Sequence, residues 1–231
     1  MSLFDVYASV PLQIAGAVGG AVCSVVAIRL AQIVPDRMEL ETRPRPQWWW
    51  ITAGVVGVAY GWVVANAFAS WALLPALLVF IAATLGLALI DLDHQLIPNR
   101  VLFPAIGATA GLLVLGALVD GVAGDLLRAA AGGLGYFAFL LLVAIVARGG
   151  FGMGDVKLAF LLGLMLAFAS WGARFVGIVG SILLGGVASG LLLMLGREGR
   201  KGRFAYGPGV VVGAWVAVGG GQRMGEWYGG R

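Results

Sequence analysis

The sequence contains few charged residues, and this scarcity limits what the protein can be. Charged residues make up 11% and hydrophobic residues 61% of the 231 residues, whereas a soluble domain carries about 25% charged residues. So few charges cannot cover the surface of a globular protein of this size, and the mean hydropathy of +0.97 agrees. We therefore expect an integral membrane protein whose surface is covered mostly by membrane lipid.

Cysteine and histidine are almost absent. Cys23 is the single cysteine and His94 the single histidine, which excludes an internal disulfide, a cysteine-rich zinc site and a multi-histidine metal site. The glycine-rich stretch 149–154 lacks the Lys-Ser/Thr pair of a phosphate-binding loop. The basic residues are divided among separate segments, which argues against nucleic acid as a partner. We expect neither a metal nor a cofactor.

Long apolar runs predict the fold. A membrane-spanning helix needs about 20 mostly apolar residues, and such runs predict an all-α bundle of about eight transmembrane helices in a single domain over residues 1–231. Glycine pairs four residues apart favour close helix packing: Gly16 and Gly20, Gly57 and Gly61, Gly107 and Gly111, Gly186 and Gly190. The runs lie near residues 9–30, 48–66, 72–90, 101–119, 128–147, 156–171, 175–196 and 206–222.

The distribution of basic residues indicates how these helices are oriented. If the N-terminus lies outside, eleven of the 15 basic residues fall on the inner side. An excess of Arg and Lys is typical of cytoplasmic segments. We therefore predict that both termini lie outside, and that residues 30–47 form a short basic cytoplasmic loop.

Three aspartates lie at the inner ends of predicted spans. Asp91 and Asp93 end the third run, and Asp155 begins the sixth. An ionisable group at membrane depth costs free energy and indicates a functional site. Asp91 and Asp93 are two residues apart and point in different directions on a helix. Only one of them is therefore expected to face Asp155.

Two carboxyl groups close together can hydrolyse a peptide bond without a metal. Their repulsion separates the two pKa values, so that one group is protonated while the other is ionised. The ionised group takes a proton from water, and the protonated group polarises the peptide carbonyl. Gly152 and Gly154 leave the backbone before Asp155 free to adopt unusual dihedral angles, and Pro98 ends the helix after Asp91. These features favour an aspartic peptidase.

Two other functions share some of these features. A proton- or ion-coupled transporter also uses intramembrane acids and glycine-interrupted helices, but it would place the acids near the membrane midplane and show symmetry between its halves. A non-catalytic scaffold for membrane assemblies would tolerate replacement of the aspartates. The position of the aspartates at one face of the membrane favours the peptidase over the transporter.

Two motifs resemble those of the type IV prepilin peptidase family. Residues 152–155 match the Gly-x-Gly-Asp pattern of intramembrane aspartic peptidases, and Asp91 is followed seven residues later by Pro98 and then Asn99, as in prepilin peptidases. The resemblance implies that Asp91 and Asp155 are the catalytic pair. It favours Asp91 over Asp93 as the partner of Asp155. The residues that would support the pair are Asp93, Gln95, Pro98, Asn99, Gly152, Gly154 and Lys157.

The resemblance also implies a substrate and a location. Residues 19–29 and 205–209 are similar to the first and last helices of the family. The expected substrate is a type IV prepilin or pseudopilin, cut after a Gly at the end of a short basic leader. The cut would take place on the cytoplasmic side of the bacterial inner membrane, for pilus, secretion or DNA-uptake filaments.

One departure from the family concerns the loop after the first helix. Many bacterial members insert a zinc domain with Cys-x-x-Cys motifs there, and N-methylation with S-adenosylmethionine is associated with those enzymes. Residues 30–47 contain no cysteine. We interpret the chain as a compact, peptidase-only form in which N-methyltransferase activity is not expected.

Overall fold

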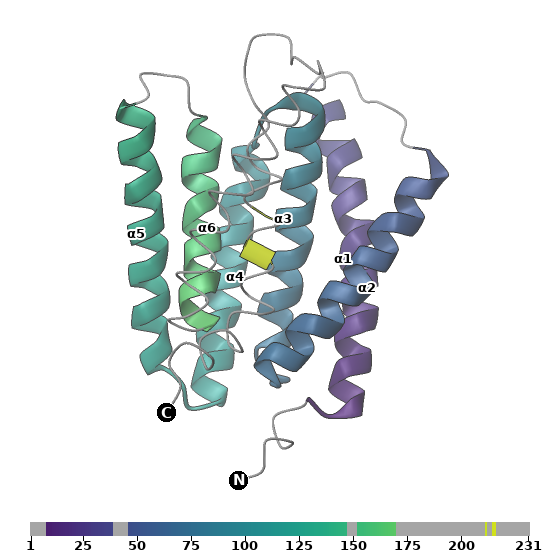
Figure 1. Ribbon diagram of the computed structural model, residues 1–231, viewed down its shortest axis with the longest axis vertical. Helices are drawn as coiled ribbons and strands as arrows, with labels where there is room; N and C mark the ends of the chain where they lie inside the picture. The colour runs from purple at the N-terminus through teal and green to yellow at the C-terminus, as the bar shows by residue number, and fades with distance from the viewer. Residues whose placement is uncertain (1–7, 39–45, 147–151, 170–210, 212–213, 216–231) are drawn as a thin grey trace. The chain divides into compact units, whose positions relative to one another are not determined.

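The computed structural model describes residues 8–38, 46–146, 152–169, 211 and 214–215. Within these ranges the regular secondary structure is entirely α-helical (Figure 1). This confirms the predicted all-α class. The helices are α1 (Val10–Asp36), α2 (Gln47–Phe68), α3 (Leu74–His94), α4 (Asn99–Val119), α5 (Gly124–Val146) and α6 (Met153–Ala169).

Five of these helices, α1 to α5, are long and apolar enough to cross a membrane. They coincide with the first five predicted runs, and α6, with 17 residues, coincides with the sixth. The seventh run lies outside the described residues, as does the eighth except for residues 211 and 214–215. The described chain thus supports an all-α membrane protein. It contains five candidate spans, fewer than the predicted total of about eight.

The first helix is longer than the predicted span. The apolar run ends near residue 30, but α1 continues to Asp36. The predicted boundary is wrong because a single charge at Arg29 does not end the span: residues 30–34 are again mostly apolar, and an arginine can extend its charge to water. Pro35 lies in the last turn, where a residue without a backbone N–H ends the helix. Residues 30–36 of the predicted loop are therefore helical.

The chain packs as two compact units. The first comprises residues 1–89 and 103–123, and the second comprises residues 90–102 and 124–231. The second unit therefore contains the last turn of α3, the beginning of α4, and the helices α5 and α6. All the residues predicted to form the active site belong to this second unit. The assignment of the chain to a single domain stays a prediction.

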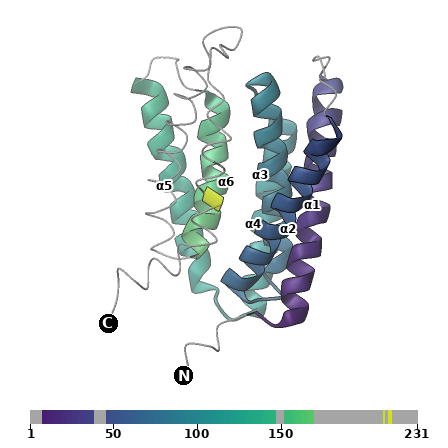
Figure 2. The same ribbon diagram turned by 45° about the vertical axis from the view of Figure 1, so that its right-hand side comes forward.

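In the first unit, glycines allow α1 and α2 to approach closely. α2 crosses α1 obliquely (Figures 1 and 2). A Cβ atom on Gly16 would lie 2.5 Å from the backbone oxygen of Gly61, and one on Gly20 would overlap the backbone of Gly57. Only glycine permits this separation of the two helix axes, and the packing role predicted for these four glycines is confirmed.

The remaining glycine pairs do not share that role in the described part of the chain. No described atom lies within 4 Å of a Cβ built on Gly107 or on Gly111. Both residues lie on a face of α4 that is exposed among the described residues, so their role in bringing helices together stays a prediction. The pair Gly186 and Gly190 lies outside the described residues.

In the second unit, α5 and α6 lie side by side (Figures 1 and 2). A Cβ on Gly163 would lie 2.6 Å from the backbone oxygen of Gly132, and one on Gly133 would lie 3.1 Å from that of Phe160. Residues 161–168 of α6 are all buried, which agrees with a helix that is apolar on every side. Close packing thus holds the helix that carries Asp155.

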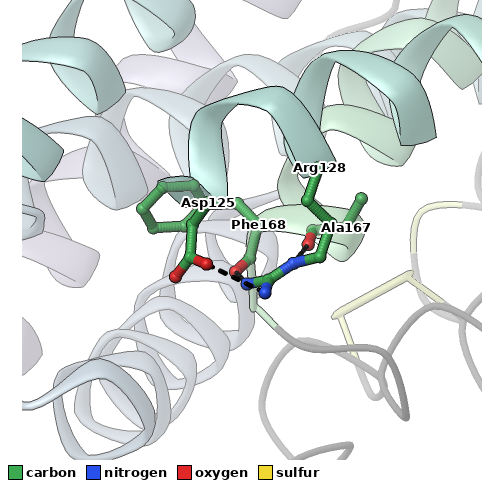
Figure 3. A network of polar contacts seen from close by, with 4 residues as sticks. All are labelled: Asp125, Arg128, Ala167 and Phe168. Atoms are coloured by element: carbon green, nitrogen blue, oxygen red, sulfur yellow. Dashed lines mark hydrogen bonds and ion pairs between the residues drawn. The ribbon is translucent and has the colours of Figure 1, made fainter. Parts of the chain in front are cut away.

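An arginine on α5 binds the C-terminal end of α6 (Figure 3). The Arg128 guanidinium donates hydrogen bonds to the backbone oxygens of Ala167 at 2.6 Å and Phe168 at 2.7 Å. Asp125 forms an ion pair with Arg128 at 2.9 Å. The last carbonyls of a helix have no partner within that helix, and a cation there is stabilising. Because Arg128 lies near the start of α5, the two helices are antiparallel.

Candidate active site

Asp91 lies in the last turn of α3 and is buried, with 5% of its surface exposed. Asp93, two residues later, is exposed. Residues two apart on a helix project in different directions, which explains why only one of the two carboxyl groups enters the interior. Of the two aspartates on α3, Asp91 is therefore the one that is enclosed by other parts of the protein.

The segment after α3 turns the chain back into α4. α3 ends at His94, and the backbone N–H of Gln95 donates to the oxygen of Asp91 at 2.8 Å. The carbonyl of Pro98 accepts hydrogen bonds from the N–H groups of Val101 and Leu102, each at 3.1 Å. Pro98 is therefore the residue directly before α4, and its carbonyl accepts the first hydrogen bonds of the new helix.

Asp155 lies in the first turn of α6 and outside the five candidate membrane spans. Its N–H donates to the carbonyl of Gly152 at 3.1 Å. Its Oδ1 atom is buried and has no hydrogen-bond partner in the described chain. Burial, followed by the negative charge of Asp91, raises the pKa of Asp155 to about 7. The charge of Asp91 thus acts directly on the second predicted catalytic residue.

The two glycines before Asp155 have different surroundings. A Cβ on Gly152 would lie 2.9 Å from the Oδ2 atom of Asp155, so glycine leaves space beside the carboxyl group. A Cβ on Gly154 would lie 2.8 Å from the Cβ of Ile97, a distance that real Cβ atoms essentially never show. Gly154 therefore lets the segment that follows Asp91 rest directly on the start of α6.

A polar contact joins the same two segments. The Lys157 ammonium donates a hydrogen bond to the Oδ1 atom of Asn99 at 3.2 Å. Lys157 is in the first turns of α6 and Asn99 begins α4. Together with the packing of Gly154 on Ile97, this contact places the turn after Asp91 against the turn that carries Asp155.

The sequence analysis did not identify Ile97 as part of this arrangement. Ile97 is 7% exposed and is the direct neighbour of Gly154. Its signal in the sequence was a pair of apolar residues, Leu96 and Ile97, placed directly before Pro98. Among the described residues, no group of three His, Cys, Asp or Glu side chains is arranged to hold a metal ion. In the described chain, the groups of this site that could act as acid and base are therefore the carboxyl groups of Asp91 and Asp155.

The chain is similar to known peptidases over this region. The model of the type IV leader peptidase family matches residues 78–190, a range that contains Asp91 and Asp155. A prepilin leader peptidase/N-methyltransferase of Bacillus subtilis strain 168 is 32% identical over 145 residues, which cover 63% of this chain and 55% of the relative. These matches support assignment of the chain to the type IV prepilin peptidase family.

Other prepilin peptidase relatives show similar identity. A prepilin leader peptidase/N-methyltransferase of Stutzerimonas stutzeri is 28% identical over 169 residues, covering 70% of this chain and 55% of the relative. One of Aeromonas hydrophila is 31% identical over 165 residues, covering 68% and 53%. The chain thus spans about half the length of these relatives. No solved structure matches it significantly.

Family membership and helix composition agree on the class of protein. The prepilin peptidases that match the chain are bacterial, and five described helices are suited to cross a membrane. The chain is therefore a multi-pass protein of the bacterial inner membrane. None of the matched relatives is named as a transporter, and nothing in these comparisons favours the transporter hypothesis.

Proposed function

We propose that the chain is an aspartic endopeptidase that removes the short basic leader of type IV prepilins or pseudopilins. The cut follows a Gly and takes place at the cytoplasmic face. The observation that supports this most directly is the contact between the link after Asp91 and the start of α6, where Ile97 meets Gly154 and Lys157 donates to Asn99. The names of the matched relatives, which are prepilin leader peptidases, support the same substrate class.

In the proposed reaction the two carboxyl groups act on a single water molecule. Because burial and the charge of Asp91 raise the pKa of Asp155 to about 7, we assign the shared proton to Asp155 and the negative charge to Asp91. Asp91 accepts a proton from water as the water oxygen attacks the peptide carbonyl, while Asp155 donates a hydrogen bond to the carbonyl oxygen. The C–N bond then breaks, and the leaving amine takes a proton from the pair. The pair titrates as one unit.

The supporting residues hold this pair in place. Gly152 leaves room beside the Asp155 carboxyl group, and Gly154 allows the link at Ile97 to pack on α6. Lys157 binds Asn99 across the same contact. Pro98 directly precedes α4. Asp93 is exposed and is positioned to meet the basic leader of a substrate at the membrane surface.

The topology and the remaining features complete the proposal. Eight spans with both termini outside place Asp91 and Asp155 on the cytoplasmic side, in agreement with the excess of basic residues there. We include no metal, cofactor or nucleic-acid partner. The absence of cysteine from residues 30–47 supports a peptidase-only form, without the N-methyltransferase activity that the names of the relatives include.

The experiment is cleavage of a purified prepilin by the protein in detergent, with leader release measured by mass spectrometry. Asp91→Asn and Asp155→Asn preserve side-chain shape but remove the acid, and each is expected to lower kcat/KM about 100-fold or more. Asp93→Asn is expected to keep a near wild-type kcat, with any loss confined to KM, because this exposed carboxyl group takes no part in the chemical step. Normal cleavage by either of the first two variants would refute the assignment, and loss only in Asp93→Asn would transfer the role to Asp93.

A further inference from the structure

Gln95 adopts a backbone conformation that its residue type disfavours. Its φ is 52°, and Ala69 at φ 50° is the one other non-glycine residue with positive φ in the described chain. The left-handed region of backbone dihedral angles is readily adopted by glycine and tolerated by asparagine, whereas other residues are strained there. A glycine at position 95 would complete the end of α3 with less strain. Such a departure at a functional site suggests that the side chain itself is needed.

The position of Gln95 relates it to the proposed catalytic pair. It follows Asp91 by four residues, and its N–H binds the Asp91 carbonyl at 2.8 Å. Gln95 is the first residue beyond α3, and its N–H completes the last turn of that helix, directly next to Asp91 along the helix axis. Gln95 is half-buried, whereas Leu92, Asp93 and Leu96 are exposed. Gln95 therefore lies within one turn of Asp91 and is less exposed than Asp93 and Leu96.

The carboxamide of Gln95 is available to bind a ligand. In the described chain no hydrogen bond is formed by its side chain. A carboxamide has two donor hydrogens and an acceptor oxygen, which match the N–H and C=O groups of a peptide main chain. It carries no charge, so it would not disturb the charge balance of the two aspartates.

We propose that Gln95 is a substrate-binding residue that hydrogen-bonds the main chain of the peptide beside the scissile bond. This inference rests on the proposed function of Asp91 and Asp155. It explains why a strained glutamine occupies a helix end where glycine would fit. A main-chain contact also suits an enzyme that acts on several substrates, because it does not depend on the side chains of the leader.

The test compares two substitutions that relieve the same kind of strain. Gln95→Gly removes the carboxamide, and the control Ala69→Gly relaxes the backbone after α2, at the C-cap residue of that helix. Both are expected to keep or raise the thermal unfolding midpoint in detergent. With a purified prepilin, Gln95→Gly is expected to raise KM about fivefold to tenfold with kcat nearly unchanged, while Ala69→Gly leaves both constants unchanged.

Two further variants separate the carboxamide from the backbone. Gln95→Ala removes the carboxamide but keeps a Cβ atom at positive φ, as in Ala69. It is expected to reproduce the rise in KM. Gln95→Asn keeps a carboxamide and suits positive φ, so it is expected to recover part of the loss. Wild-type KM in both Gln95→Gly and Gln95→Ala would overturn the proposal, as would equal losses in Gln95→Gly and Ala69→Gly.

The same assay distinguishes this proposal from the proposed function. If the wild type cleaves prepilin and the Asp91→Asn and Asp155→Asn variants do not, the peptidase assignment stands whatever Gln95→Gly shows. If these aspartate variants cleave normally, the peptidase assignment fails first, and the role of Gln95 fails with it.

Discussion

The carboxyl group of Asp155 is subject to influences that act in opposite directions. Its burial and the nearby charge of Asp91 raise its pKa, to about 7. Its position in the first turn of α6 favours the ionised form, because the N-terminal end of a helix carries partial positive charge. The effect of burial on the pKa is larger, because the free-energy cost of removing a carboxylate from water exceeds the stabilisation that one helix end provides. A carboxyl group with this pKa can donate a proton near neutral pH.

This pKa predicts the pH dependence of cleavage. Asp155 is the protonated member of the pair in the proposed mechanism, so kcat/KM is expected to fall as pH rises through about 7. The measurement is a pH–rate profile with a purified prepilin in detergent. A profile that stays level from neutral to mildly alkaline pH would contradict the assigned proton.

The same pKa predicts how stability depends on pH. Since the folded value of about 7 exceeds the ordinary value of 3.8, the folded protein binds more protons between these values than the unfolded one. Stability is therefore highest below the lower value and falls as pH rises towards the upper one. Thermal unfolding should show this decline in the wild type and a weaker decline in Asp155→Asn. An equal slope in both proteins would remove Asp155 as the cause.

Gly154 is the residue whose replacement should most disturb the geometry of the pair. A Cβ there would lie 2.8 Å from the Cβ of Ile97, an atom close to the backbone that cannot turn aside. Gly154→Ala is expected to push the link after Asp91 away from α6 and to lower kcat/KM about tenfold to 100-fold, because small misplacements of catalytic groups are costly. Leader release by the purified variant measures this.

A matched control separates crowding from the general effect of adding a methyl group to a helix. A Cβ on Gly135 of α5 meets no described atom within 4 Å. Gly135→Ala should cleave prepilin normally, and helix propensity favours alanine there by about 1 kcal/mol or less. Equal losses in Gly154→Ala and Gly135→Ala would show that the contact with Ile97 is not the reason.

Among the helices, α6 is held at both of its ends. At its start, Ile97 and Asn99 contact Gly154 and Lys157. At its other end, Arg128 binds the last carbonyls (Figure 3). Between the two ends, the glycines of α5 and α6 allow the backbones of the two helices to pack in close contact. This explains how a helix of 17 residues can hold a carboxyl group in a defined place.

The arginine contact predicts a loss of stability when it is removed. Arg128→Gln leaves the α6 carbonyls without a charged donor and frees Asp125 from its ion pair, so unfolding is expected to become easier by about 1–3 kcal/mol. Arg128→Lys should recover part of this, because one ammonium cannot copy the planar guanidinium. Thermal unfolding in detergent gives the comparison.

Arg37 supplies the control for loss of a positive charge. It is exposed just beyond the end of α1, and Arg37→Gln is expected to unfold like the wild type. If Arg128→Gln were as stable as Arg37→Gln, the contact with α6 would contribute nothing measurable.

For the whole molecule, orientation in the membrane decides which compartment the active site faces. Cys23 is the single cysteine and is buried, with 7% exposed. A Cys23→Ser background therefore allows single cysteines at Met38, which is 38% exposed, and Val122, which is 37% exposed. In spheroplasts, an impermeant maleimide is expected to label Val122→Cys, and to label Met38→Cys only after permeabilisation. The reverse pattern would place Asp91 and Asp155 on the outer side.

Much of this molecule could be predicted from local sequence features. Runs of apolar residues locate α1 to α6 to within several residues, because a helix in lipid must satisfy its own backbone hydrogen bonds. The run predicted to end near residue 30 stops too early for α1, since one charge at Arg29 does not end a helix whose next residues are again apolar. Spacing alone also does not distinguish Gly20, which packs on α2, from Gly111, which meets no described atom.

The sequence by itself determined the membrane class, the helical spans and the small set of acids able to perform chemistry. These properties depend on composition and on residues close together in the chain. Only the tertiary structure decided that Asp91 is buried while Asp93 is exposed, that Ile97 rests on Gly154, and that Gln95 has a strained backbone. Such facts depend on which distant segments pack together, and no local pattern of residues contains that information.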